Sequence, residues 1–504
     1  MFQSRPYLAC ASALLAGALG FSATQSASAE THLLVMGGGS SPTSNQISLE
    51  KNVNYFYRVL DHLGLKDAPR DILFACGDEP TTNDVVYNAS ASDDPEVVRL
   101  IDMLVGPGKA ISKQFRPHDI GGGEITSSKD NIVKWFDDHA GELEQDDKLL
   151  IYFTGHGGRG TKEDKQNTSL YLWPKHNIRM DAFTTELDKM NPDTPVVMVM
   201  VQCFSGGFAN VIFNEGDPAK GLSDYNRCGF YAAVHSRPAA GCTPHVNEAD
   251  YKEYSSYFWA ALSGEDRVGE PVVRPDYDGD GETTYLEAHA YAIIHSDSTD
   301  LSMTTTDRMA RALEVVIEDQ DAGQLSTDSA YPDLYAAADP TRRAMLDGLS
   351  QRLNLVGDDR TAQARAALER ARKDRGELFK RRRELGKQIN TLRKELVDPI
   401  SERWPGLADP KNGDAPGTVV EHAEPIRLAI AGQSAFAELN DKLDELERIG
   451  DERDALTATI AHAERYLYTC ESVAKIDTLL RFGTPEQVAA YERLLAREMA
   501  TPSR

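Results

Sequence analysis

The sequence predicts an α/β sandwich with a mainly parallel β-sheet, followed by an α-helical hairpin. Two observations indicate this fold class. Residues 31–300 alternate between short, wholly apolar runs and amphipathic segments, which is typical of a parallel sheet covered by helices on both faces. After about residue 340 the chain becomes dense in charge and repeats leucine every seven residues, a pattern of long helices that pair with each other.

Within the first region, the apolar runs are predicted strands and the segments between them are predicted helices. The strands are expected at residues 31–39, 70–77, 149–153, 195–202 and 229–236. The helices, in which apolar residues recur at helical spacing, are expected at residues 48–64, 127–143, 181–190 and 254–264. Ser127 and Asp130 have the spacing of a capping box at the start of the second helix.

The charged C-terminal region predicts two helices, at residues 362–397 and 436–467, joined by a Pro/Gly-rich linker at 404–417. Apolar residues follow a heptad pattern along the first helix: Leu378, Leu385, Ile389, Leu392 and Leu396. We expect the two helices to fold back on each other. A charged hairpin that packs on the α/β domain is favoured over an intermolecular coiled coil, because only about four heptads are continuous.

The N-terminus has the features of a cleavable secretory signal peptide over residues 1–29. Arg5 precedes an apolar run at residues 8–21, which is shorter than the ~20 residues that a membrane span needs. Ala27-Ser28-Ala29 before Glu30 is a typical cleavage site. We therefore expect a secreted or periplasmic protein without a membrane span. Cys10 precedes most of the apolar run, which argues against a lipoprotein anchor.

Length and charge limit the number of domains and the kinds of partner. The 504 residues suffice for two or three domains, and we expect an α/β domain at 30–300, a peripheral segment at 301–340 and the helical region at 341–504. A formal net charge of −25 argues against nucleic acid or an anionic membrane as the main partner, because both attract basic surfaces.

Five cysteines follow the predicted leader, and an odd number leaves at least one thiol free. Because export allows disulfides, Cys228–Cys242 is the first expected pair and Cys76–Cys470 the second. A zinc site formed by Cys228, Cys242 and His245 is an alternative, although the spacing lacks a paired zinc motif.

Cys203 and His156 are the candidate catalytic pair. Each follows a buried strand and precedes glycines, in the stretches YFTGHGG (152–158) and VQCFSGG (201–207). Parallel strands that end at the same sheet edge bring such residues together, and ligand sites gather at this edge. A neighbouring imidazole helps a thiol to become a nucleophilic thiolate. The alternative is an inert buried thiol and a histidine in a turn.

These two stretches resemble the signature blocks of the caspase-like cysteine peptidases, which include caspases, metacaspases, legumains and gingipains. The resemblance covers residues 31–300 and is closest to the legumain and metacaspase style, since Gln202 directly precedes Cys203 and Ser205-Gly206 follows it. It implies a caspase-like three-layer sandwich and an endopeptidase that acts through a thioester acyl-enzyme.

The resemblance also implies roles for individual residues. Cys203 would attack the scissile carbonyl and His156 would transfer the proton, while the backbone N–H groups of Gly157 and Cys203 would bind the oxyanion. The pocket for the substrate residue before the scissile bond would draw on His235, Ser236 and Arg237, of which Arg237 suits an acidic residue. Ser44-Asn45 stand where legumains carry an Arg-His pair, so the resemblance gives no support for cleavage after asparagine.

A second motif, DYDGDGETTYLE at residues 276–287, predicts a structural Ca²⁺ site. The ligand positions of an EF-hand loop are filled by Asp276, Asp278, Asp280, Glu282 (through its carbonyl) and Glu287, with Thr284 at the ninth position. The preceding run contains Gly and Pro and does not form a good entering helix, so we expect half of an EF-hand or a dockerin-type site. A solvated acidic loop without an ion is the alternative.

The sequence thus favours an exported cysteine endopeptidase that takes protein or peptide substrates. Legumains carry a C-terminal helical region that covers the active site, and by this resemblance residues 341–504 are expected to inhibit the enzyme intramolecularly. Two other functions remain open: a non-catalytic caspase-like scaffold whose hairpin binds a partner, and a transamidase that passes the same acyl-enzyme to an amine.

Overall fold

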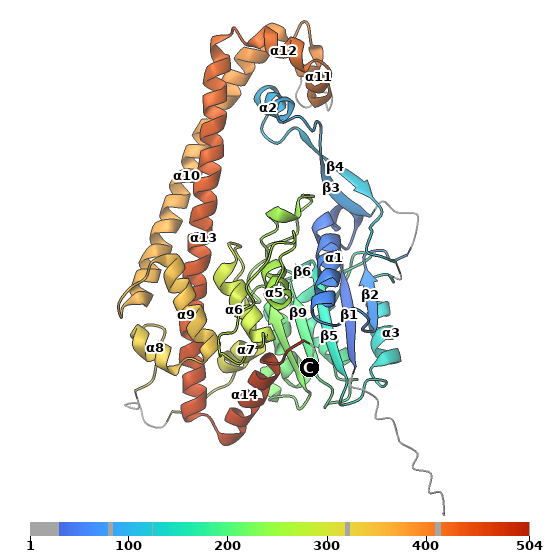
Figure 1. Cartoon of the computed structure of the whole chain (residues 1–504), viewed down its shortest axis with the longest axis vertical. Coiled ribbons are helices and arrows are strands. Elements are labelled where there is room, and N and C mark those ends of the chain that lie inside the picture. The colour runs from blue at the N-terminus through green and yellow to red at the C-terminus, as the bar shows by residue number, and fades with distance from the viewer. Residues whose placement is uncertain (1–29, 79–83, 123, 318–322, 409–414, 503–504) are drawn as a thin grey trace, which may run out of the picture.

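A six-stranded β-sheet forms the centre of the molecule (Figure 1). The structure is a computed structural model and describes residues 30–78, 84–122, 124–317, 323–408 and 415–502. The strands of the sheet are β1 (Thr31–Gly38), β2 (Arg70–Phe74), β5 (Lys148–Gly155), β9 (Val196–Met200), β10 (Arg227–Tyr231) and β11 (Met303–Thr304). Their order is β11-β10-β9-β5-β1-β2. Only β11, at one edge, is antiparallel to its neighbour. The predicted α/β class with a mainly parallel sheet is confirmed.

The helices of the α/β domain cover both faces of this sheet. They are α1 (Ile47–His62), α3 (Lys129–His139), α4 (Met180–Leu187), α5 (Tyr254–Ser263) and α6 (Tyr285–His295). The chain runs from β1 outward to β2, and then back through β5 to β9. Because crossovers between parallel strands are right-handed, α1 lies on one face and α3 and α4 lie on the other.

Aromatic side chains fill the space between the sheet and the helices. Phe56 of α1 lies 5.0 Å from Tyr152 of β5 and 4.7 Å from Trp259 of α5, measured between ring centroids. On the other face, Phe136 of α3 and Phe183 of α4 are 5.8 Å apart. Burial of these rings is a main source of stability in such a core.

The start of α3 differs from the prediction by one residue. Ser128 caps the helix, and its side chain accepts a hydrogen bond from the backbone N–H of Asn131. The expected capping box of Ser127 and Asp130 is therefore wrong. Ser127 is held outside the helix, because its N–H donates to the carbonyl of Ala75 and its carbonyl accepts from the N–H of Trp173.

Two smaller sheets surround the carboxyl ends of the central strands. One is a hairpin of β3 (Val85–Ser90) and β4 (Ile111–Arg116), which carries helix α2 (Pro95–Leu104). The other joins β6 (Gly157–Gly158), β7 (Ser169–Leu172) and β8 (His176–Arg179). Neither sheet was among the expected elements.

The chain after β11 is mainly helical. The peripheral segment contains α7 (Thr305–Ala312) and α8 (Tyr331–Ala337), and the C-terminal region follows with α9 (Pro340–Leu353), α10 (Arg360–Val397), α11 (Ala415–Glu421), α12 (Ala423–Ile430), α13 (Ser434–Phe482) and α14 (Pro485–Glu498). The two long helices, α10 and α13, lie side by side and extend away from the sheet (Figure 1). The heptad residues Leu385 and Ile389 of α10 and Leu439 of α13 belong to one buried cluster. The apolar stripe of α10 thus packs against α13 of the same chain.

The far end of the hairpin contacts the α/β domain through α2. Figure 1 shows α2 beside the far end of the hairpin. Ile101 and Leu104 of α2 are buried in the same cluster as Leu385 and Leu439. At the near end, Leu479 of α13 and Tyr491 of α14 join the core of the central sheet. Removal of residues 341–504 would therefore also remove core side chains, and point substitutions are the better test of any inhibitory role.

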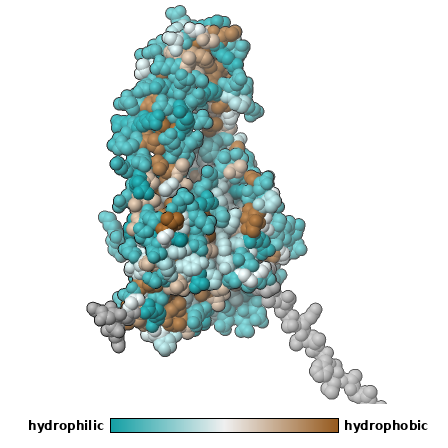
Figure 2. Space-filling view, turned by 60° about the vertical axis from the view of Figure 1, so that its left-hand side comes forward, coloured by the Kyte–Doolittle hydropathy of each residue, from teal (hydrophilic) through white to brown (hydrophobic). Residues whose placement is uncertain are grey.

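The surface of the hairpin is mainly hydrophilic on the face that Figure 2 shows, with apolar side chains in small separate groups. Among the described residues, no helix combines the length and the apolarity needed to cross a membrane. The expected signal peptide, residues 1–29, lies outside the described part of the chain.

Candidate active site

His156 and Cys203 occupy matched positions after two neighbouring strands. Strands β5 and β9 are parallel and adjacent, and Phe153 pairs with Met200. His156 and Cys203 each stand three residues beyond this pair. The parallel register therefore brings the imidazole and the thiol to the same edge of the sheet. This edge lies beside the point between β1 and β5 where the direction of the crossovers reverses, which is where parallel sheets bind ligands.

The imidazole of His156 is held by the loop that follows β1. Its Nε2 lies 2.7 Å from the carbonyl oxygen of Ser44 and 2.9 Å from Oε1 of Gln46. Burial lowers the pKa of His156, partly opposed by the hydrogen bond with Ser44. A backbone carbonyl accepts only, so Nε2 carries the proton. In the neutral ring, Nδ1 is then the basic nitrogen.

The thiol of Cys203 is partly buried beside the segment that follows β10. Its Sγ lies 3.6 Å from the carbonyl oxygen of Ala239 and accepts from the Ala239 N–H at 3.4 Å. Burial raises the pKa of Cys203. Within the described residues, no hydrogen bond joins Cys203 to His156. The resting pair is therefore a neutral thiol and a neutral imidazole.

Gly157 packs directly against the backbone of Cys203. A Cβ atom at position 157 would lie 2.1 Å from the carbonyl oxygen of Cys203 and 2.6 Å from Cγ of Gln202, so no other residue fits without a shift of the backbone. The carbonyl of His156 accepts from the N–H of Tyr171, and Gly157 pairs with Leu170. In an antiparallel ladder this places Gly157 at a non-hydrogen-bonded position, with its N–H directed away from β7.

The turn after Cys203 has a strained backbone. Phe204 has φ = 63° and ψ = 19°, a left-handed conformation that costs a side-chain-bearing residue of order 1 kcal/mol or more. Its N–H donates to the carbonyl oxygen of Arg237 at 2.8 Å. The strained turn thus ties the residue after the thiol to the segment predicted to form the substrate pocket.

The three predicted pocket residues have different surroundings. His235 is half-buried, with Nε2 3.4 Å from Nε2 of Gln166. Ser236 is exposed. Arg237 forms two hydrogen bonds to the carboxylate of Glu464 on α13, one of them 3.0 Å long. No sequence pattern predicts an acidic partner for Arg237 from the C-terminal region.

Helix α13 also forms one wall of a cavity of about 460 Å³. The opposite wall belongs to the segment 240–253, which directly follows the contact of Ala239 with Cys203. Arg465 of α13 holds the neighbouring loop, since it donates to the carbonyl oxygens of Ser298 at 2.9 Å and Asp300 at 2.8 Å. The C-terminal region therefore takes part in the surroundings of the thiol.

The expected disulfides do not form. Among the described residues, none of the five cysteines forms a disulfide. Cys228 lies near the amino ends of the strands, beside Thr31 and Lys148, whereas Sγ of Cys242 lies 3.8 Å from the carbonyl oxygen of Gly155 at the carboxyl end of β5. These opposite positions also rule out the alternative zinc site with His245. Cys76 and Cys470 are buried in different parts of the molecule, since Cys76 contacts Asp84 and Cys470 contacts Thr361.

The predicted calcium loop brings three of its four expected carboxylate ligands together. Carboxylate oxygens of Asp276, Asp278 and Glu287 lie within 4.8 Å of one another, and the carboxylate of Asp280 is not part of this group. Glu287 is buried, and its Oε2 accepts from the N–H of Thr284 at 2.9 Å. Gly281, at the sixth position of the motif, has φ = 86°, a conformation that glycine adopts without strain.

Two groups of residues were not found by sequence reasoning. The first is the pair of contacts that Ser44 and Gln46 make with His156. The second is a compact group of Cys76, Asp84 and His118. Cys76 follows a buried strand, as Cys203 does, and this position could have marked it in the sequence as a candidate site residue. Asp84 and His118 lie in no linear motif and become neighbours only through the β3–β4 hairpin.

The chain was also compared with known proteins. No protein-family model matches it, and no curated protein matches it.

Proposed function

We propose that this protein is an exported cysteine endopeptidase of the caspase-like type, with Cys203 as the nucleophile and His156 as the general acid and base. The observation that carries the proposal is the shared register of β5 and β9, which sets both residues three positions beyond one paired position. The glycine contact between Gly157 and Cys203 supports it, because it brings the two strand ends into direct backbone contact.

In the proposed reaction, Nδ1 of His156 takes the thiol proton as Sγ of Cys203 attacks the scissile carbonyl carbon. The N–H groups of Gly157 and Cys203 stabilise the oxyanion. His156 then gives the proton to the leaving amine as the C–N bond breaks, which leaves a thioester on Cys203. Water, deprotonated by the same nitrogen, attacks the thioester and releases the acid and the free thiol.

The proposed substrates carry an acidic residue before the scissile bond, because Arg237 would bind its carboxylate. The ion pair between Arg237 and Glu464 supports this specificity, since it already pairs Arg237 with a carboxylate. Because it forms this ion pair, the carboxylate of Glu464 occupies the proposed pocket in the resting protein. The C-terminal region would thus inhibit the enzyme through a contact that resembles the proposed substrate.

A structural Ca²⁺ is part of the proposal. The carboxylates of Asp276, Asp278 and Glu287 would supply ligands, and oxygen donors of this kind suit a hard cation. Bound calcium would fix the start of α6, because Glu287 lies in its first turn.

The test is labelling of the full-length protein with peptide probes that alkylate thiols and differ in the residue before the reactive group. Intact mass and peptide mapping identify the labelled cysteine. We expect label on Cys203, fastest with aspartate or glutamate probes and at least tenfold slower in His156→Ala. Cys242→Ala, which removes a neighbouring thiol, is the control and should label like the wild type.

The non-catalytic scaffold remains the second candidate, and one observation favours it. Cys203 bonds to Ala239 rather than to His156 in the described structure. If Cys203 labels no faster than the denatured protein's thiols, and its rate does not depend on His156 or on the probe sequence, the scaffold is the better description.

A further inference from the structure

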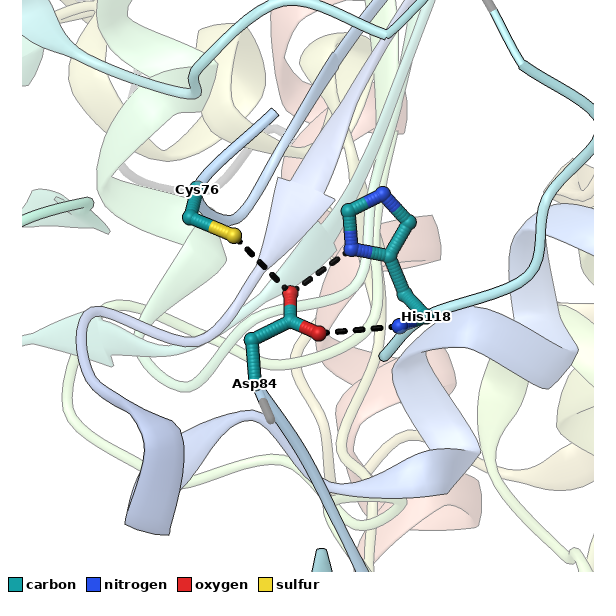
Figure 3. A group of neighbouring side chains, drawn as sticks. All are labelled: Cys76, Asp84 and His118. Atoms are coloured by element: carbon teal, nitrogen blue, oxygen red, sulfur yellow. Dashed lines mark hydrogen bonds and ion pairs between the residues drawn. The ribbon is translucent and has the colours of Figure 1, made fainter. Parts of the chain in front are cut away.

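A buried group of three potential metal ligands lies on the far side of the β1–α1 loop from His156. Cys76 follows β2, Asp84 precedes β3, and His118 follows β4, so three segments contribute one side chain each. Oδ2 of Asp84 lies 3.3 Å from Sγ of Cys76 and 2.7 Å from Nδ1 of His118. Figure 3 shows the three side chains pointing toward one another.

The group is well enclosed and held in place. Cys76 is 2% exposed and Asp84 is 1% exposed. Oδ1 of Asp84 accepts from the backbone N–H of His118 at 2.9 Å, which fixes the carboxylate and leaves Oδ2 at the centre of the group. The ring of His118 packs edge-on against Phe74 of β2, 5.3 Å away. A ligand atom is thus presented from each segment without a further change of fold.

A cavity of about 230 Å³ adjoins the three side chains. Its lining includes all three of them, together with Asp78 and Glu124. Three protein ligands beside an open space is the arrangement in which a zinc ion keeps its fourth position for water or another small ligand.

We propose that Cys76, Asp84 and His118 bind one zinc(II) ion. A thiolate, an imidazole nitrogen and a carboxylate oxygen form a donor set typical of zinc. In tetrahedral zinc with ordinary bond lengths, a sulfur ligand lies about 3.5 Å from an oxygen ligand. A nitrogen ligand lies about 3.3 Å from the same oxygen ligand. The Cys76–Asp84 separation is already close to the first of these values, and the His118–Asp84 separation would widen by about 0.6 Å.

Binding replaces two hydrogens by the metal. The ion displaces the thiol proton of Cys76 and the proton between Nδ1 of His118 and Asp84, and both are released to solvent. Without the ion, the same three residues form a hydrogen-bonded ion pair with a neighbouring thiol. This metal-free arrangement is the competing interpretation, and the experiment must distinguish the two.

The site is connected to the loop that holds His156. Nδ2 of Asn45 donates to Oδ2 of Asp84 at 3.4 Å, and Oδ1 of Asn45 accepts from the N–H of Gly39 at 2.9 Å. The residues on either side, Ser44 and Gln46, contact Nε2 of His156. The ion would therefore stabilise this loop as well as the β3–β4 hairpin. This consequence does not depend on whether Cys203 is a nucleophile.

The test uses cobalt(II) as a spectroscopic substitute for zinc in the full-length Cys203→Ala protein, which lacks the partly exposed thiol near His156. After treatment with a chelator, the protein is titrated with Co²⁺ and then with Zn²⁺. We expect one equivalent of Co²⁺ to produce a thiolate-to-cobalt charge-transfer absorption, which one equivalent of Zn²⁺ then abolishes. Metal analysis should return one zinc per chain.

Substitutions assign the ligands. Cys76→Ser should abolish the charge-transfer absorption, and His118→Gln should weaken metal binding at least tenfold. Cys242→Ser, which removes a half-buried thiol elsewhere, should leave both unchanged. Circular dichroism of each metal-free variant checks its folding, and Asp84→Asn provides a third variant if one of the others does not fold. The absence of the absorption at equimolar Co²⁺, or its persistence in Cys76→Ser, would overturn the proposal.

Discussion

Arg237 and Glu464 form a two-point ion pair between the segment after β10 and helix α13, although 227 residues separate them in the sequence. Glu464 also accepts from Arg372 of α10 at 2.6 Å. Its side chain is only 13% exposed, whereas that of Arg237 is 35% exposed. One carboxylate of the C-terminal region therefore holds an arginine of the predicted substrate pocket against both long helices.

Glu464→Gln is expected to make the pocket more accessible. The neutral amide weakens the contact with Arg237, and a loss of about 1 kcal/mol would increase the accessible fraction about fivefold. The measurement is the rate at which acidic peptide probes label Cys203. Glu452→Gln, an exposed position on the same helix, is the matched control. Equal labelling rates for the wild type and Glu464→Gln would contradict an inhibitory role for this contact.

Gly157→Ala should disable the site without unfolding the protein. The new Cβ would meet the carbonyl oxygen of Cys203 at 2.1 Å, so the backbone must move and the oxyanion donors with it. We expect labelling of Cys203 to slow at least tenfold, in line with the loss of an oxyanion-hole donor. Gly141→Ala, where a Cβ meets nothing within 4 Å, should behave like the wild type. Normal labelling of Gly157→Ala would refute the assigned geometry.

The reactivity of Cys203 should keep rising with pH. Burial raises the pKa of its thiol and lowers the pKa of His156, so the resting pair is neutral and the thiolate forms at higher pH than for an ordinary exposed thiol. The rate of alkylation by iodoacetamide, followed at Cys203 by peptide mapping, should increase through pH 8 and 9. A plateau below pH 7 would instead indicate a thiolate–imidazolium pair.

The titration of Glu498 should lower the free energy of unfolding as the pH rises. Burial raises the pKa of Glu498 to about 7, while its carboxylate accepts hydrogen bonds from Thr305 and Thr306. A folded-state pKa above the unfolded value gives stability that is fully present below about pH 4.5 and is lost as the pH rises through 7.

Glu498→Gln removes this titration. The difference in unfolding free energy between the wild type and the variant should therefore change by about 3 kcal/mol between pH 4.5 and pH 8. Chemical denaturation at several pH values measures it. A difference that stays constant with pH would show that Glu498 titrates normally in the folded protein.

Calcium should raise the melting temperature of the wild type. Three carboxylates that lie within 4.8 Å of one another repel each other without a cation, and a ligand that binds only the folded state stabilises it. At 100 times its dissociation constant the ion would add about 2.7 kcal/mol. Asp278→Asn should reduce this gain, whereas Glu270→Gln, an exposed acidic residue outside the loop, should retain it. An unchanged melting temperature on addition of Ca²⁺ would contradict the site.

Local sequence patterns predicted the elements of the α/β domain well. The wholly apolar runs at 149–153 and 195–202 became the buried strands β5 and β9, because only a strand covered on both faces tolerates such composition. The same reasoning placed His156 and Cys203 at one edge. The capping box at Ser127 was wrong by one residue, since contacts with Ala75 and Trp173, distant in sequence, decide where α3 begins.

Contacts between distant segments could not be predicted in this way. The heptad stripe predicted the hairpin, but not that Leu385 would pack beside Ile101 of α2. Nothing near Arg237 in the sequence points to Glu464. The expected Cys228–Cys242 disulfide was wrong because 14 residues of chain suffice to pass from one end of the sheet to the other. The group of Cys76, Asp84 and His118 depends on a hairpin that had no clear pattern.

The most direct measurement of the central claim is the identification of peptide bonds cleaved by the protein. An unfolded protein mixture is incubated with the wild type, Glu464→Gln, Cys203→Ala and His156→Ala, and the new N-termini are identified by mass spectrometry. We predict cleavages that share an acidic residue before the scissile bond, are most frequent with Glu464→Gln, and are lost with Cys203→Ala and His156→Ala. The same cleavages with Cys203→Ala, or none with Glu464→Gln, would contradict the account.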